Sequence, residues 1–147
     1  MDNPSETIAQ IRAFNRFYTD LIGLLDKYLP NSTYTLAEAR TLYEIVHGHQ
    51  VRASHITQAL YIDKSYLSRI LARLEKNRII TRQPSPEDAR ASILTLTAKG
   101  KKEYEALNHA ATEQIARLLT PLSLQNRAEL AAHMTAIRQL LQNAKKA

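Results

Sequence analysis

The sequence contains no cysteine, and it lacks several other features that would mark a particular class of protein. Without cysteine the chain has no disulfide, no thiolate metal site and no thiol for redox sensing. No apolar run approaches the about 20 residues that a membrane helix needs. The first ten residues lack the basic start and apolar middle of a secretion signal. We therefore expect a cytoplasmic protein that does not associate with membranes.

Sequence motifs of catalysis are also missing. The chain has no metalloprotease motif, no phosphate-binding loop and no nucleophile elbow. It has no internal repeat and no linker long enough to separate two domains. Its length of 147 residues suits one domain, and 44% hydrophobic with 23% charged residues is typical of a globular chain. We predict a single domain over residues 1–147, which is not an enzyme and uses no cofactor.

Positive charge is concentrated in the middle of the chain. Residues 51–102 contain eleven Lys and Arg but four Asp and Glu, whereas the rest of the chain has nine basic and ten acidic residues. The net charge of +6 therefore comes entirely from the middle third. A surface that faces a polyanion has this composition, and so does a solvated basic face.

Apolar residues recur at helical spacing through most of the sequence. Residues that cap helices stand before each periodic segment. The predicted helices cover about residues 5–25, 36–47, 55–60, 64–76, 98–119 and 124–141, with Ser5, Thr35, Ser54, Asp63, Thr97 and Ser123 as their N-caps. The segment YLPNSTYT separates the first two helices.

The basic middle of the chain has the pattern of a helix-turn-helix. Two short helices, over residues 55–60 and 64–76, are joined by the tight connection YID. The second has a polar, basic outer face and an apolar stripe that consists of Leu67, Ile70, Leu71 and Leu74.

A β-hairpin is predicted directly after these helices. The strand-like segments IITRQP and ASILTLT flank the charged, proline-containing turn SPEDAR. A helix-turn-helix followed by a hairpin is a winged helix. We predict a mainly α-helical fold with a small β-hairpin: a winged helix-turn-helix lobe at residues 35–97, flanked by long helices within residues 1–34 and 98–147.

An acid and a base stand two residues apart at the tip of the predicted wing. The narrow minor groove of DNA attracts arginine, and a free arginine loses rotamer entropy when it inserts there. We expect Asp88 to orient the guanidinium of Arg90 by a bidentate contact, so that Arg90 inserts into the minor groove. The alternative is an exposed ion pair of about 0–1 kcal/mol with no further role.

The order of these motifs resembles the MarR family of bacterial transcription regulators over nearly the whole chain. The likeness rests on LSRILARLEKNRIITR, on DAR and on LTLTAKGKK. The resemblance implies a homodimer in which the first, fifth and sixth helices form the dimerisation region. One position departs from the family, which usually has glycine after the recognition helix where this chain has Arg78. Since asparagine tolerates the left-handed conformation better than arginine, we expect the helix to end at Asn77.

The predicted DNA contacts lie on the recognition helix and the wing. We expect Arg69 to read a guanine, and Ser65 and Ser68 to contact base edges or phosphates. Lys64, Arg73 and Lys76 are expected at phosphates, and a second group of phosphate candidates consists of Ser54, Thr57 and Arg82. The alternative for each cation is solvated helix surface. For Tyr66 the sequence leaves both packing and DNA contact open.

The N-terminal half contains candidate residues for two further kinds of site, an effector site and a metal site. By the family resemblance, a small aromatic or amphipathic effector binds between the dimerisation helices and the DNA-binding lobe, and its candidate contacts are Phe14, Phe17, Tyr18, Arg40, Tyr43 and His47. The alternative is that these aromatic side chains form core or dimer interface. His47, His49 and His55 fall short of the three or four ligands that a metal site needs, so no metal is predicted.

The leading interpretation is a DNA-binding transcriptional regulator. We expect a ligand-responsive repressor that binds a pseudo-palindromic operator in double-stranded DNA as a homodimer, with half-sites roughly one helical turn, about 10 base pairs, apart. Parts of the first two helices also resemble MarR-type domains that precede an acetyltransferase domain, so one alternative is a regulatory module of such a protein. A winged helix that binds protein is a second alternative.

Overall fold

The computed structural model describes residues 3–27 and 33–146, so the predicted break at residues 28–32 lies outside the described part. The fold is mainly α-helical with one two-stranded antiparallel hairpin, as the sequence predicts. None of the described helices is long and apolar enough to cross a membrane. The elements are α1 (Pro4–Lys27), α2 (Leu36–His47), α3 (Ala53–Leu60), α4 (Lys64–Lys76), β1 (Ile80–Pro84), β2 (Ser92–Leu96), α5 (Ala98–Leu119) and α6 (Leu124–Lys146).

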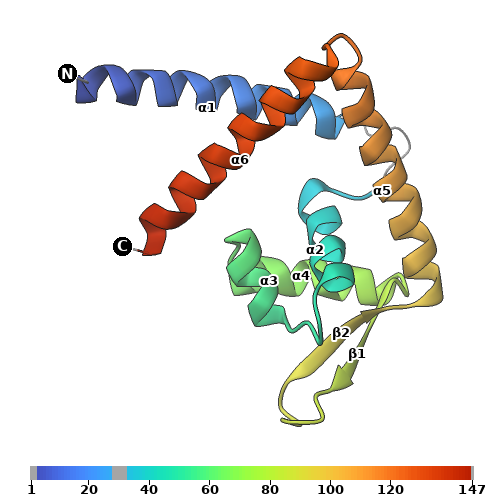
Figure 1. Cartoon of the computed structure of the whole chain (residues 1–147). Helices are drawn as coiled ribbons and strands as arrows, with labels where there is room; N and C mark the ends of the chain where they lie inside the picture. Colours follow the sequence, from blue (N-terminus) through green and yellow to red (C-terminus); the bar gives the residue numbers. More distant parts are fainter. Residues whose placement is uncertain (1–2, 28–32, 147) are drawn as a thin grey trace. The chain divides into compact units, whose positions relative to one another are not determined.

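The chain divides into two compact units, residues 1–110 and 111–147. The first unit contains the winged-helix lobe, which we define as α2, α3, α4, the hairpin and the first turns of α5. Figure 1 shows α2, α3 and α4 gathered together, with β1 and β2 extending from them as a wing. The second unit contains the end of α5 and α6.

One hydrophobic core holds the winged-helix lobe together. All four residues of the predicted apolar stripe of α4 are buried, which confirms that prediction. They pack with side chains from α2, α3, the hairpin and α5 because each element presents one apolar face. The buried core consists of Leu42, Ile45, Val51, Ile56, Leu60, Leu67, Ile70, Leu71, Leu74, Ile79, Ile80, Leu94, Tyr104 and Leu107.

Four of the six predicted N-caps make the expected hydrogen bond. The hydroxyl of Thr35 accepts from the backbone N–H of Glu38 at 3.2 Å, and the carboxylate of Asp63 accepts from that of Tyr66 at 2.7 Å. Thr97 and Ser123 cap α5 and α6 in the same way. These bonds satisfy N–H groups that lack a partner within the helix.

The other two predicted caps are wrong. Helix α3 begins at Ala53, and Arg52 precedes it; the Nδ1 atom of His55 accepts from the backbone N–H of Arg52 at 3.2 Å. Helix α1 begins at Pro4, because the side chain of Asn3 accepts from the N–H of Ser5 at 3.1 Å. Proline suits the first helical position, where no N–H is needed.

Helix α4 ends with Asn77 as its C-cap, as the sequence predicts, but the left-handed residue is not Asn77. Asn77 has φ −83° and ψ 5°, whereas Arg78 takes the left-handed conformation with φ 60°. The backbone N–H of Ile79 donates to Leu74 O at 2.9 Å and that of Arg78 to Glu75 O at 3.0 Å, which is a Schellman motif. The burial of Ile79, at 1% exposed, fixes this geometry and places the left-handed residue at Arg78.

The hairpin and α5 meet at a close backbone contact. Strand β1 pairs antiparallel with β2, with Ile80 opposite Leu96 and Pro84 opposite Ser92. A Cβ atom at Gly100 would lie 2.0 Å from the carbonyl oxygen of Ile79, so only glycine allows α5 to approach the strand this closely.

Helices α1 and α6 leave large apolar side chains exposed. None of the described side chains of α1 is buried, and α6 has no buried residue. Each helix nevertheless carries apolar residues at helical spacing. The exposed set includes Ile8, Ile11, Phe14, Phe17 and Leu24 on α1, and Leu124, Met134, Ile137, Leu140 and Leu141 on α6.

Candidate nucleic-acid interface

The N-terminal half of α4 presents a polar, basic surface to solvent. Lys64, Ser65, Ser68 and Arg69 are all exposed, while Leu67 between them is buried. The helix is fixed at its start by the Asp63 cap and along its inner face by the core. Four candidate DNA-contacting side chains therefore stand together on a rigidly held helix.

Tyr66 supports the side chain of Arg69. The guanidinium carbon of Arg69 lies 5.8 Å from the centroid of the Tyr66 ring, within the range of a cation–π contact. This contact reduces the freedom of the arginine before it meets a ligand. The sequence left the role of Tyr66 open, and its ring lies against a neighbouring side chain on the same helix.

The acid–base pair of the wing has a geometry that differs from the sequence prediction. The Asp88 carboxylate accepts a hydrogen bond from the backbone N–H of Arg90 at 3.0 Å. Within residues 3–27 and 33–146, the ion pairs do not include a contact between Asp88 and the Arg90 guanidinium. The predicted bidentate contact is therefore wrong, since the carboxylate closes an Asx-type turn. Both side chains are exposed at the wing tip.

Three arginines line a cleft of about 300 Å³ between the start of α3 and the wing. We call this the arginine cleft; its lining includes Arg52, Arg82 and Arg90, together with Ser54 and Ser92. Arg52 comes from the start of α3, Arg82 from β1 and Arg90 from the turn between the strands. Guanidinium groups that converge with hydroxyls are suited to bind phosphate oxygens.

Arg52 is the residue of this cleft that sequence reasoning missed. Its guanidinium donates to the hydroxyl of Ser85, which is 5% exposed, at 3.3 Å. The same hydroxyl accepts from the N–H of Glu87 at 3.3 Å. The arginine thus joins α3 to the turn of the wing across 33 residues of sequence. One signal in the sequence could have indicated Arg52 as a phosphate ligand: it lies two residues before Ser54, which is itself a phosphate candidate.

Two other predicted phosphate ligands are paired with carboxylates. The Nη1 atom of Arg73 lies 3.0 Å from Oε1 of Glu38, and the Nε atom of Arg82 lies 2.7 Å from Oε2 of Glu75. Lys76 is exposed, and the hydroxyl of Thr57 donates to the carbonyl of Ser54 at 2.9 Å. The candidate cations of the lobe are therefore not equivalent, because two of them share their charge with an acid.

The six candidate effector residues fall into separate groups. The rings of Phe14 and Tyr18 are stacked in α1, with centroids 5.5 Å apart. In the lobe, the rings of Tyr43 and His47 lie 4.2 Å apart, and His47 Nε2 lies 3.2 Å from the hydroxyl of Tyr104. Phe17 and Arg40 are exposed. Among the described residues, no ring contact or hydrogen bond joins the α1 group to the α2 group.

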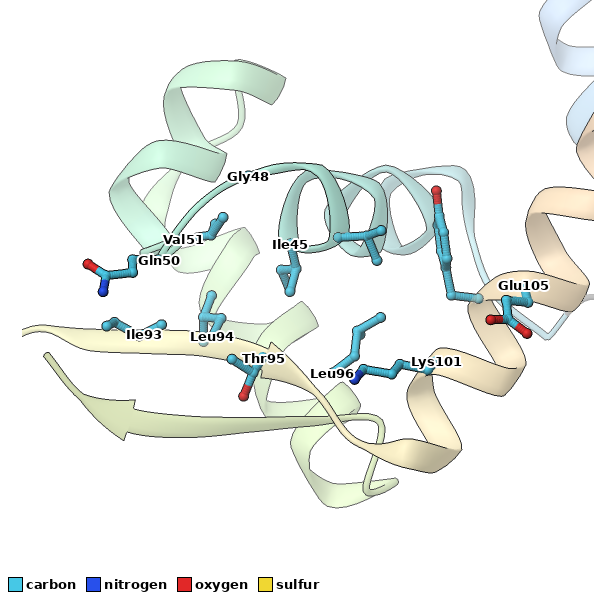
Figure 2. Close-up of a pocket in the computed structure, with 12 residues that line it drawn as sticks. Ile45, Gly48, Gln50, Val51, Ile93, Leu94, Thr95, Leu96, Lys101 and Glu105 are labelled. Atoms are coloured by element: carbon cyan, nitrogen blue, oxygen red, sulfur yellow. The ribbon is translucent and has the colours of Figure 1, made fainter.

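Another hollow of the lobe lies between α2, β2 and α5. It has a volume of about 560 Å³ and is mostly apolar, with Lys101 and Glu105 of α5 among its lining. Figure 2 shows Ile45 of α2 and Leu94 of β2 pointing into the space between the two elements. Tyr104 also lines it, and burial, with a smaller effect of Tyr43, raises the pKa of the Tyr104 phenol above its usual value.

Two histidines of the lobe, His47 and His55, contact other groups of the protein. His47 contacts Tyr43 and Tyr104, and His55 accepts the backbone hydrogen bond at the start of α3. Within the part of the chain that the structure describes, no three His, Asp or Glu side chains are grouped so as to hold a metal ion.

Residues 32–91, which include α2, α3, α4, β1 and the turn after it, match the model of the MarR family. This part of the chain is therefore similar to MarR-family proteins. Among curated proteins, the chain is 22% identical over 139 residues to YdgJ of Bacillus subtilis, which covers 95% of the chain and 81% of YdgJ. It is 29% identical over 100 residues to YfiV of the same organism, which covers 68% of the chain and 62% of YfiV. Both relatives are described as uncharacterized HTH-type transcriptional regulators.

Solved structures of MarR-type proteins share this fold. A mutant MarR from E. coli, complexed with operator DNA, matches with a TM-score of 0.74 and 23% identity over 93% of this chain and 99% of its own. PcaV from Streptomyces coelicolor, in complex with its natural ligand, matches with a TM-score of 0.72 and 21% identity over 89% and 91% of the two chains. The chain thus has the same winged-helix fold as these solved structures.

Proposed function

We propose that this protein is a MarR-family regulator that binds double-stranded DNA through α4 and the arginine cleft. The observation that carries the proposal is that the exposed cations of α4 and the three arginines of the cleft belong to one lobe. The excess positive charge of the chain lies in this same segment. A protein-binding winged helix has no reason to concentrate cations in this way.

The two parts of the interface have different tasks in this proposal. Arg69, Ser65 and Ser68 face base edges in the major groove, with Arg69 held by Tyr66. Lys64 and Lys76 contact phosphates beside them. The arginine cleft, with Ser54, binds the backbone next to the wing, and Arg90 reaches from its edge to the minor groove. Asp88 acts on the turn backbone rather than on the guanidinium.

The DNA-bound form is proposed to be a homodimer. The exposed apolar residues of α1 and α6 support this proposal, because large apolar surfaces on a soluble chain mark interaction sites. A two-fold dimer presents two α4 helices and therefore binds a pseudo-palindromic operator with half-sites about 10 base pairs apart. Occupation of such an operator makes the protein a repressor.

A small amphipathic effector is proposed to regulate DNA binding. The hollow of about 560 Å³ between α2, β2 and α5 supports this, since it is mostly apolar, has two charged groups among its lining and is of ligand size. Strand β2 of the wing forms part of it, so an occupant would bias the wing. We therefore propose this hollow as the effector site, in place of the predicted set of Phe14, Phe17, Tyr18, Arg40, Tyr43 and His47.

The test of DNA binding is a titration of fluorescent duplex DNA by anisotropy at several salt concentrations. One duplex comes from upstream of the protein's own gene and one is unrelated. We expect the first to be preferred and its affinity to fall steeply with salt. Arg69→Ala should weaken binding by about 1–3 kcal/mol and reduce the preference between duplexes. Arg52→Ala should weaken binding to both duplexes equally.

Arg138→Ala is the matched control, because it removes one positive charge from α6, outside the lobe. It should leave both affinities within twofold of the wild type. Equal losses in all three variants would mean that only net charge matters. Weak, salt-insensitive binding by the wild type would refute the DNA-binding proposal and favour a protein partner.

A further inference from the structure

A buried acid in the winged-helix lobe has no role in the DNA-binding proposal. Glu38 lies in the first turn of α2 and is 4% exposed. Its carboxylate is paired with Arg73 of α4 at 3.0 Å, and the two residues are 35 positions apart in the sequence. A buried charge is stable only when it is paired. Arg73, whose side chain is 55% exposed, supplies this pairing from the surface of the lobe.

This pair is one of several contacts, the Arg82–Glu75 ion pair among them, that hold the C-terminal end of α4. The ammonium group of Lys99 donates to the carbonyl of Asn77 at 3.1 Å, and the hydroxyl of Thr97 donates to that of Arg78 at 2.6 Å. The first two turns of α4 carry the exposed DNA candidates instead. The helix is thus anchored to α2 and α5 at one end and presents its other end to solvent.

The sequence alone places Arg73 with the DNA-facing residues of α4. Successive residues of an α-helix are turned by about 100°, so Arg73 lies on the polar side only about 40° from Arg69. In the structure, however, Arg73 lies on the flank that faces α2, where its guanidinium forms an ion pair with Glu38. The two arginines therefore have different surroundings although their positions on the helix are similar.

We propose that Arg73 is a positioning residue that fixes the orientation of α4 through Glu38, and that it is not a phosphate ligand. The inference rests on the proposed DNA-binding function. A change of helix orientation misplaces the side chains that read base edges, whereas flexible lysines still reach phosphates. Loss of the pair should therefore reduce the preference for the correct sequence more than the general affinity for DNA.

The test compares Arg73→Gln with Lys76→Gln, a matched variant of an exposed cation three residues further along α4. Both are titrated against the two duplexes described above at several salt concentrations. Lys76→Gln should weaken binding to both duplexes equally and reduce the salt slope by about 0.9, as loss of one phosphate contact requires. Arg73→Gln should weaken binding to the preferred duplex about tenfold, leave the unrelated duplex within twofold and keep the wild-type slope.

Glu38→Gln distinguishes the two roles by the sign of its effect. This variant removes a negative charge and so frees the guanidinium of Arg73. If Arg73 positions the helix, binding to the preferred duplex weakens about as much as in Arg73→Gln, and the double variant is no weaker than either single one. If Arg73 is a phosphate ligand, Glu38→Gln binds both duplexes more tightly.

Arg73→Lys keeps a positive charge beside Glu38, so it is the variant with which the positioning role is tested if the other variants fail to fold. It should lose part of the preference between duplexes at an unchanged salt slope. Wild-type preference in Arg73→Lys, tighter binding by Glu38→Gln, or a slope reduced by about 0.9 in Arg73→Gln would each overturn the positioning role. A wild-type protein that prefers neither duplex would instead overturn the proposed function itself.

Discussion

The winged-helix lobe and the two long helices α1 and α6 have the same kind of amphipathic sequence but opposite burial. In the lobe, fourteen apolar side chains form a closed core. On α6 no residue is buried, and Leu140 and Leu141 are 72% and 63% exposed. An apolar stripe therefore shows that a helix face needs a partner, but only the fold shows whether the chain itself provides one. The lobe is self-sufficient, and α1 and α6 are proposed to be covered by a second copy.

The largest expected effect comes from removing the same side chain in the two regions. Leu71→Ala leaves a cavity in the lobe, where Leu71 is 1% exposed, and should lower the free energy of unfolding by about 2–5 kcal/mol. Leu124→Ala, at a position that is 81% exposed in the single chain, should change the stability of the monomer by less than about 0.5 kcal/mol when both variants are unfolded at concentrations below the dimer dissociation constant. Urea unfolding of both variants measures the difference, and equal losses would contradict the contrast in burial.

A charge on α6 should break the proposed dimer and leave the lobe intact. Leu140→Asp places one carboxylate per chain in the apolar face, so we expect the dimer dissociation constant to rise at least about tenfold, about 1.4 kcal/mol. Sedimentation velocity over a range of concentrations measures this. Gln142→Asp adds the same charge at an exposed polar position and is the control. A Leu140→Asp protein that keeps the mass of the wild type would rule out this face as the interface.

Inside the lobe, one of the three described non-glycine residues with positive φ allows a stabilising change. Arg78 has φ 60°, a conformation that is less favourable for arginine than for glycine by roughly 1 kcal/mol. Arg78→Gly should therefore raise the free energy of unfolding by about 1 kcal/mol, seen as a higher urea midpoint at an unchanged slope. Arg78→Ala keeps the left-handed strain and should show no such gain. A gain of similar size in both variants would show that the arginine side chain, and not its backbone, is unfavourable.

The smallest expected effect is a pH dependence at the junction of α2 and α5. Burial raises the pKa of Tyr104, so the folded lobe holds the phenol proton more tightly than the unfolded chain does. The resulting contribution is complete below the unfolded pKa of about 10 and is lost as the pH rises through the folded pKa. Urea unfolding between pH 8 and 11 should show a smaller alkaline loss for Tyr104→Phe than for the wild type. Identical pH profiles would contradict this.

Local signals in the sequence predicted most of the lobe. The limits of α4, its buried stripe and its Asp63 cap follow from the spacing of Leu67, Ile70, Leu71 and Leu74 and from one capping side chain. The predictions failed where two local signals compete. Ser54 is a good capping residue, but α3 begins at Ala53 and His55 accepts from the N–H of Arg52. Asn77 favours the left-handed conformation, yet burial of Ile79 assigns it to Arg78.

The candidate interface was predicted in its composition but not in its pairing. The sequence by itself determined that a basic helix-turn-helix precedes a hairpin, because helix periodicity, strand alternation and capping act over a few residues. Only the tertiary structure decided that Arg73 meets Glu38 and that Arg52 reaches Ser85. Both contacts join segments more than 30 residues apart. Their partners are set by how the core packs, which no local pattern of residues encodes.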